Sequence, residues 1–222
     1  MNTPKFKLIT GDCIEVLSRA DACCVDLVVT DPPYLVNFTD RTGRSVTNDN
    51  DSTWLEPAFE QITRVLKPGG FCVSFYGWSH AERFLTVWKQ FGLRPVGHLV
   101  WSKSYSSSRR GFLRSTHECA YLLAKGTPNR PGYLINDVLP WSYTGNRSHP
   151  TQKPVSALEP LIAAFSQQGD TVLDPFSGSG STGVAALLQG RDFLGIELES
   201  EFNLLARDRL SSYGTNAAAE SR

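Results

Sequence analysis

Short runs of apolar residues alternate along the chain with segments in which apolar residues recur at helical spacing. The apolar runs predict seven strands, at residues 6–10, 25–30, 71–76, 96–101, 119–124, 171–173 and 193–196. The helical spacing predicts helices at residues 13–19, 54–66, 80–90, 155–166, 182–189 and 199–210. Near-continuous apolar strands that alternate with helices favour an α/β fold, with a mostly parallel seven-stranded sheet covered by helices on both faces.

Local signals mark the ends of one of these helices. Thr53 stands three residues before Glu56, a spacing at which it is expected to cap the helix that runs to about residue 66. Lys67-Pro68-Gly69-Gly70 is expected to end that helix, because proline removes a backbone donor and glycine allows positive φ.

Four acidic residues fall at the ends of predicted strands. Asp12, Asp31 and Asp174 each come just after a strand, and Glu197 ends another. The carboxyl ends of parallel strands meet at one edge of a sheet, where open α/β sheets bind their ligands. The sequence therefore predicts that these carboxylates share one site.

The segment Phe176-Ser177-Gly178-Ser179-Gly180-Ser181-Thr182 lies between a predicted strand and a predicted helix. Its glycines permit a tight turn and let a ligand approach the backbone. No Lys precedes Ser181 and no G-x-S-x-G pattern occurs, so neither a P-loop nor a nucleophile elbow is indicated. With Glu197 at the end of the next strand, the turn is typical of a nucleoside cofactor site in which the carboxylate accepts the ribose hydroxyls. The alternative is a tight turn beside a solvated Glu197.

Asp31-Pro32-Pro33-Tyr34 follows a β-branched run typical of a buried strand. The prolines stiffen this loop, which offers acceptors and no backbone donor at either proline. The Asp31 carboxylate and the Pro32 carbonyl could accept hydrogen bonds from the exocyclic amine of adenine or cytosine and free its lone pair for attack. Tyr34 could stack on a base that has left the duplex. A strand-exit turn with a core tyrosine is the alternative.

Charge and composition limit the kinds of binding partner that the sequence makes expected. The 222 residues have no net charge, yet residues 101–154 hold eight Lys and Arg against Glu118 and Asp137. This asymmetry predicts either a basic face for nucleic acid or a patchy solvated surface. None of the five cysteines has the spacing of a zinc site, so no metal is expected. No apolar stretch has membrane length and the first residues lack a signal-peptide pattern, so a cytoplasmic location and no membrane partner are expected.

Together these motifs resemble those of the S-adenosylmethionine-dependent amino-methyltransferases of DNA. The catalytic D-P-P-Y of that family stands at Asp31–Tyr34, its F-x-G-x-G at Phe176–Gly180 and its H-P-x-Q-K-P at His149–Pro154. Smaller family elements correspond to Asp12, Lys67–Gly70 and His117-Glu118. The order, with the catalytic motif first, resembles the circularly permuted β class, and the resemblance spans residues 8–210.

The resemblance implies a Rossmann-like methyltransferase domain over residues 1–214, followed by a disordered tail at 215–222. S-adenosylmethionine would be the cofactor and Asp31, Pro32, Pro33 and Tyr34 the catalytic residues. Glu197 would bind the ribose and Asp12 the adenine, while Thr151 and Lys153 would border the methionine carboxylate. The full set implied to bind the cofactor is Asp12, Cys13, Asp31, Thr151, Lys153, Asp174, Phe176, Ser177, Gly178, Gly180, Thr182 and Glu197.

The same resemblance implies double-stranded DNA as the partner, with recognition loops at about 35–52 and 102–147. Lys103, Arg109, Arg110 and Arg114 would contact phosphates or guanine edges; a solvated basic loop is the alternative. Because many members of this family form dimers, a homodimer is one expected assembly.

The aspartate at the first motif position favours adenine N6 as the methyl acceptor, because cytosine-N4 enzymes of this class more often begin the motif with serine. Cytosine N4 is the alternative acceptor, since both amines suit the same chemistry. A DNA-binding module without catalysis is a third interpretation, which the two complete motifs disfavour.

Overall fold

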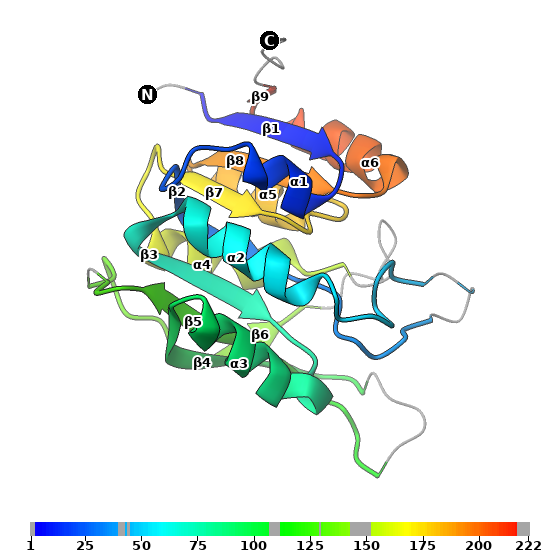
Figure 1. The fold of residues 1–222 in the computed structure, drawn as a ribbon. Coiled ribbons are helices and arrows are strands. Elements are labelled where there is room, and N and C mark those ends of the chain that lie inside the picture. Colours follow the sequence, from blue (N-terminus) through cyan, green and yellow to red (C-terminus); the bar gives the residue numbers. More distant parts are fainter. Residues whose placement is uncertain are drawn as a thin grey trace.

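The computed structural model describes residues 3–39, 43, 45–106, 112–128, 130–142 and 152–216. One α/β sheet runs through this part of the chain (Figure 1). Its strands are β1 (Lys5–Thr10), β2 (Val25–Thr30), β3 (Leu66–Phe75), β4 (Leu93–Lys103), β5 (His117–Lys125), β6 (Val138–Trp141), β7 (Thr171–Asp174), β8 (Asp192–Glu197) and β9 (Thr215–Asn216). The helices are α1 (Cys13–Ser18), α2 (Leu55–Val65), the 3₁₀ turn η1 (Trp78–His80), α3 (Ala81–Gln90), α4 (Val155–Phe165), α5 (Ser181–Leu188) and α6 (Ser200–Leu210).

The strand order is β6-β4-β5-β3-β2-β7-β8-β1-β9, and only β5 runs against its neighbours. The predicted mostly parallel sheet is therefore confirmed, but the predicted count of seven strands is wrong, because the described residues form nine. The two additional strands are the short β6, which pairs with β4, and the two-residue β9, which pairs with β1. The run that forms β6, Val-Leu-Pro-Trp, contains a proline, which argues against a strand, and β9 is only Thr-Asn, so neither stood out in the sequence.

Helices cover both faces of the sheet, as predicted. In Figure 1, α1, α2 and α3 lie in front of the sheet and α4, α5 and α6 lie behind it. Each layer encloses its own apolar cluster: Val28 of β2 packs with α2 and α3, while Leu27 and Val29 pack on the side of α4 and α5. Alternate residues of this central strand thus serve opposite faces, which explains why the whole run is apolar.

Three local predictions are corrected. Thr53 does not cap α2; its hydroxyl donates to Asp51 instead, and the helix begins at Leu55 without a side-chain cap. The helix α2 does end directly before Lys67–Gly70, at Val65, and Gly69 has the expected positive φ of 81°, but these four residues already belong to β3 rather than preceding it. The pairing of β3 with β2 shifts register there, between Val25 and Leu27. The tail is ordered through Asn216, since the Thr215 amide donates to the Pro4 carbonyl at 3.1 Å; residues 217–222 lie outside the described residues.

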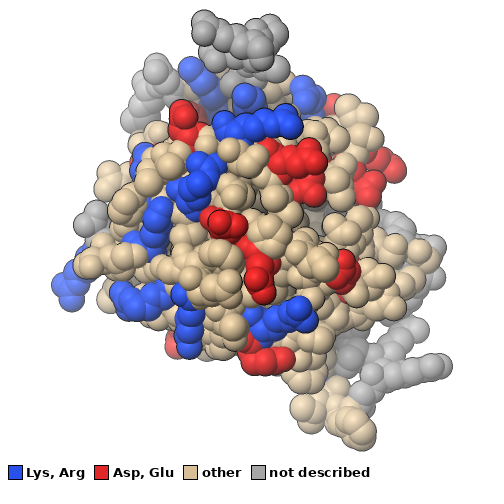
Figure 2. Space-filling model, viewed as in Figure 1, with Lys and Arg blue, Asp and Glu red and all other residues tan. Residues whose placement is uncertain are grey.

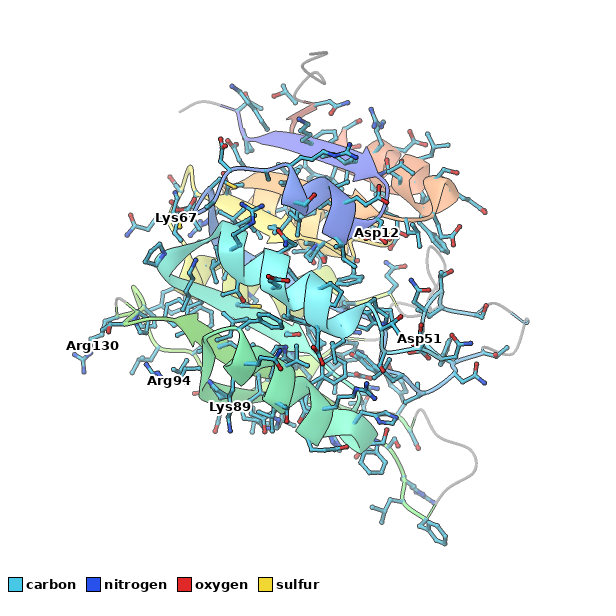
Figure 3. All side chains as sticks on the ribbon, in the orientation of Figure 1. Asp12, Asp51, Lys67, Lys89, Arg94 and Arg130 are labelled. Atoms are coloured by element: carbon cyan, nitrogen blue, oxygen red, sulfur yellow. The ribbon has the colours of Figure 1, made fainter. Side chains whose placement is uncertain are left out.

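The basic residues that the structure describes between positions 101 and 154 do not gather on one face. Because β5 is antiparallel, Lys125 at its end lies where the parallel strands begin, and its ammonium donates to the carbonyls of Thr63 (2.7 Å) and Leu66 (2.6 Å). Arg130 lies on the same side as Lys67, Lys89 and Arg94 in Figure 3, and Figure 2 shows Lys and Arg gathered there. Of the two predicted alternatives, the described residues therefore favour a patchy surface over one basic face. None of the helices in these parts of the chain is long and apolar enough to cross a membrane.

Lys125 is expected to stabilise the junction between α2 and β3. Lys125→Met should lower the free energy of unfolding by about 2 kcal/mol, because two carbonyls would lose a charged donor. Urea unfolding followed by circular dichroism measures the change. Lys89→Met, at an exposed position of α3, is the control and should change little. Equal stability of the Lys125 variant and the wild type would show that water replaces the ammonium without cost.

Candidate active site

Four strands deliver polar residues to one end of the sheet. Asp12 follows β1, Asp31 follows β2, Asp174 ends β7 and Glu197 ends β8, and these strands are mutually parallel. All four carboxylates line one cavity of about 380 Å³. The prediction that they share a site is confirmed. The cavity is also lined by Cys13, Pro32, Pro33, Tyr34, Lys153, Phe176, Ser177, Gly178 and Thr182.

Asp31 is held on both of its carboxylate oxygens. The Tyr34 hydroxyl donates to Oδ1 at 2.7 Å, and Oδ2 forms an ion pair with the ammonium of Lys153. The Lys153 nitrogen lies 5.4 Å from the centre of the Tyr34 ring and 4.9 Å from that of Phe75, within the range of cation–π attraction. Asp31, Tyr34 and Lys153 therefore form a rigid unit at the wall of the cavity.

The protonation of this unit follows from its surroundings. Burial raises the pKa of Asp31, while the Lys153 ammonium and the Tyr34 hydroxyl oppose the shift. Burial, together with the charge of Asp31, raises the pKa of Tyr34 well above its usual value, so that hydroxyl stays protonated and acts as a donor. Lys153 lines the cavity and its ammonium pairs with Asp31; the predicted contact with a cofactor carboxylate stays a prediction.

Asp174 organises the turn that follows β7. Its Oδ2 accepts from the Thr182 hydroxyl at 2.7 Å and its Oδ1 from the Phe176 amide at 3.1 Å, so both ends of the turn are tied to one carboxyl group. Burial raises the pKa of Asp174 to about 7, and the nearby charge of Asp31 adds to the effect. At Gly180, with φ of +78°, an added Cβ would lie 2.9 Å from that of Ala206, so α6 packs directly against the turn.

Glu197 is fixed by the same turn. Its Oε2 accepts from the Gly178 amide at 2.7 Å and its Oε1 from the Glu199 amide at 2.9 Å. Burial raises the pKa of this carboxyl. A carboxylate oriented by backbone amides keeps further lone pairs, which can accept the two hydroxyls of a ribose.

The cavity suits a cofactor that is both cationic and rich in acceptors. Besides the four strand-end acids, the acidic residues Asp49, Glu199 and Glu201 line the cavity. Among the described residues, Lys153 is the basic residue that lines it. The Ser177 and Ser181 hydroxyls are buried at the cavity and have no hydrogen-bond partner within the described residues. S-adenosylmethionine carries a sulfonium and an ammonium for the acids, and a carboxylate for such donors. Burial raises the pKa of Cys13 to about 12, so this residue offers a neutral, weakly polar wall.

The predicted DNA-contacting residues separate in the structure. Lys103 is buried; its ammonium pairs with Glu118 and lies 5.6 Å from the centre of the Trp141 ring. It is not placed to meet a phosphate, because phosphate contacts require an exposed side chain. Arg114 is exposed in the β4–β5 connection. Arg109, Arg110 and Thr151 lie outside the described residues.

The loop at 35–52 was expected to read DNA, but part of it lines the cavity. The lining residues that were not predicted include Val36, Phe38, Val46, Thr47, Asn48, Asp49, Trp54, Gln152, Glu199 and Glu201. The Trp54 ring packs edge-on against Phe176 of the cofactor turn, with centroids 5.2 Å apart. A tryptophan just ahead of a polar helix start was a signal that could have indicated this contact; Asp49 stood in a polar run with nothing to single it out.

Comparison with known proteins agrees with this geometry. Residues 25–208 match the family model N6_N4_Mtase, described as DNA methylase. The chain belongs to this DNA methylase family. It is therefore a DNA methyltransferase of the group that acts on N6 or N4 amino nitrogens, with S-adenosylmethionine as its cofactor.

Individual relatives are similar over nearly their whole length. "Putative methylase YubD" of Escherichia coli (strain K12) is 48% identical over 206 residues, which are 93% of this chain and 90% of that protein. Type II methyltransferase M2.DpnII of Streptococcus pneumoniae is 30% identical over 247 residues, 95% of this chain and 91% of its own. The crystal structure of the M1.HpyAVI–SAM complex is 25% identical, covers 92% of this chain and 100% of its own, and has a TM-score of 0.71.

Asp174 makes the stability of this methyltransferase depend on pH. Burial raises the pKa of Asp174 from 3.8 to about 7. Between these two pH values the Asp174 carboxyl is protonated in the folded state and ionised in the unfolded state. The free energy of unfolding should therefore fall relative to that of Asp174→Asn as the pH rises from 4 to 7, by at most about 4 kcal/mol. Denaturant unfolding of both proteins across this range measures the difference. The exposed Asp21→Asn is the control, and a constant offset for Asp174→Asn would contradict the raised pKa.

Proposed function

We propose that this enzyme transfers the methyl group of S-adenosylmethionine to adenine N6 of a base flipped out of duplex DNA. The observation that carries the proposal is the Asp31 carboxylate, fixed between Lys153 and the Tyr34 hydroxyl at the cavity wall. An acceptor held in this way can take a hydrogen bond from an amine without reorganising. Aspartate at the first motif position favours adenine, by resemblance to the adenine-specific enzymes of the class.

The chain's own residues orient the amine and manage its proton. Asp31 and the Pro32 carbonyl accept from the two N–H groups, which draws the nitrogen toward a pyramidal shape and exposes its lone pair. The cofactor, when bound, would supply an electrophilic methyl group, and breaking of its sulfur–methyl bond would leave a neutral thioether. As the amine nitrogen bonds to that carbon it must lose one proton, and the burial that raises the pKa of Asp31 favours uptake of that proton at its carboxylate. Tyr34 stays protonated and presents its ring to the base.

The cofactor turn supplies the remaining roles. Glu197 is proposed to accept the ribose hydroxyls and Asp12 to contact the adenine ring, since both side chains line the cavity. The buried hydroxyls of Ser177 and Ser181 are proposed as donors to the methionine carboxylate. Gly178 lines the cavity and is proposed to let this end of the cofactor approach the backbone, whereas Gly180 allows α6 to pack against the turn.

The β4–β5 connection is the proposed DNA contact. It follows β4 at the same edge as the cavity, and Arg114 is exposed within it. Arg109 and Arg110 belong to the same connection in the sequence. Arginines on this side of the sheet would hold phosphates while a base enters the site.

Asp31→Ala should abolish methyl transfer, because the amine would lose its fixed acceptor. Binding of S-adenosylmethionine should survive within about tenfold, a change of roughly 1.4 kcal/mol. Transfer of labelled methyl to duplex DNA, with mass analysis of the digested nucleosides, gives both the rate and the modified base. Asp21→Ala, an exposed carboxylate ahead of β2, is the matched control.

Three results would count against the proposal. Turnover by Asp31→Ala would remove its assigned role. N4-methylcytosine in the digest, without N6-methyladenine, would show that the methyl acceptor is cytosine N4 and not adenine N6. Cofactor binding without methylation of any duplex by the wild type would favour a DNA-binding module.

Arg109→Ala combined with Arg110→Ala should weaken DNA binding and reduce the slope of log affinity against log salt by about two units, because each phosphate contact contributes about 0.9. Fluorescence anisotropy with a labelled duplex over a salt series measures the slope. The control is Lys89→Ala with Arg94→Ala, which removes two charges at the opposite edge of the sheet (Figure 3). If the control pair changes the slope and the test pair does not, DNA binds the opposite edge.

A further inference from the structure

The chain turns sharply around one buried carboxylate directly after the catalytic loop. The Leu35 amide donates to Asp49 Oδ1 at 2.8 Å, and the Phe38 amide donates to Asp49 Oδ2 at 2.6 Å. The Asn37 amide donates to the Asp49 carbonyl at 3.1 Å. Asp49 is only 3% exposed. Three amides of residues 35–38 therefore converge on a single residue that lies far along the loop.

This turn is conformationally costly without Asp49. Leu35 has φ of 64° and Asn37 has φ of 53°, both in the left-handed region that side chains other than glycine disfavour. Leu35 is bonded covalently to Tyr34, whose hydroxyl donates to Asp31. The hydrogen bonds to Asp49 thus fix the path by which the chain leaves the catalytic loop.

The segment that carries Asp49 also contacts the cofactor side of the cavity. The Thr47 hydroxyl donates to Glu199 Oε1 at 2.8 Å, and the Glu199 amide donates to Glu197. The Trp54 indole donates to the Asn48 carbonyl at 3.1 Å while its ring packs on Phe176. Val36, Phe38 and residues 45–49 all line the cavity. A ligand in the cavity would touch this segment and the cofactor turn together.

We propose that Asp49 is a positioning residue that couples occupation of the cofactor cavity to the geometry of the Asp31–Tyr34 loop. One end of the 45–49 segment holds the exit of that loop, and the other contacts Glu199 and, through Trp54, the cofactor turn. A ligand that contacts the segment would further restrain the exit of the catalytic loop through the amides of Leu35 and Phe38. The activity readout rests on the proposed methyl transfer, whereas the binding and exchange readouts do not.

Asp49→Asn tests the coupling with almost no change of volume. An amide side chain accepts through one atom and presents N–H donors at the other, so one of the two backbone amides loses its partner. We expect kcat at saturating cofactor to fall about tenfold to a hundredfold, as misplaced catalytic groups do. The dissociation constant for S-adenosylmethionine should rise. In the wild type the cofactor should slow hydrogen exchange at the Leu35 and Phe38 amides, and in Asp49→Asn this protection should be lost.

The matched control is Asp51→Asn, an exposed aspartate of the same polar run that accepts from Thr53 (Figure 3). It should leave kcat, cofactor affinity and amide protection unchanged. If Asp49→Asn exchanges faster at Leu35 and Phe38 yet keeps wild-type kcat and affinity, the coupling is refuted. If the wild type methylates no DNA, cofactor-dependent protection of the two amides still decides the coupling, while the proposed function fails separately.

Thr47→Val serves if Asp49→Asn does not fold. This exposed position loses only the hydrogen bond to Glu199. The coupling predicts a several-fold weaker affinity for S-adenosylmethionine and reduced cofactor-dependent protection at the Leu35 and Phe38 amides. Wild-type values of both would overturn the proposal.

Discussion

The ion pair between Asp31 and Lys153 joins two parts of the chain that lie 122 positions apart. Asp31 leaves the sheet at the end of β2, and Lys153 precedes α4, which leads into β7 beside β2. The adjacency of β2 and β7 therefore sets the distance between the catalytic and cofactor motifs. Burying both charges costs desolvation, which only close pairing offsets. The pair thus favours one alignment of the two halves over neighbouring ones.

Charge in the cavity is balanced by a few fixed donors. Asp174 and Glu197 accept from backbone amides and from the Thr182 hydroxyl, so the turn between them organises both carboxyl groups. Burial raises the pKa of each carboxyl group, because removing a carboxylate from water costs free energy. The protein without cofactor bears this cost. A cationic cofactor relieves that cost. The same acids that destabilise the fold near neutral pH therefore favour binding of a sulfonium.

Short-range signals in the sequence predicted the clustering of the strand-end carboxylates and most of the sheet. The β-branched run at 25–30 became β2 with the predicted bounds, and the glycine turn formed between β7 and α5. Features that depend on how distant parts of the chain pair in space could not be predicted from the sequence. The reversal of β5 divides the basic stretch between both edges of the sheet, and Lys103 is buried against Glu118 rather than exposed. A charge count along the chain contains neither the direction of a strand nor the burial of a side chain.

The composition of the Asp31–Tyr34 loop explains why residues outside the loop hold it in place. Pro32 and Pro33 have no N–H group, so the loop cannot be anchored by backbone donors at those positions. It must be held from its ends, by Lys153 and Tyr34 at Asp31 and by Asp49 at Leu35. In the sequence Asp49 and Asp51 are equivalent members of one polar run, yet one is buried among backbone amides and the other is exposed. The distinction exists only once the chain has turned back at Leu35, so a residue that fixes the loop leaves no pattern of its own.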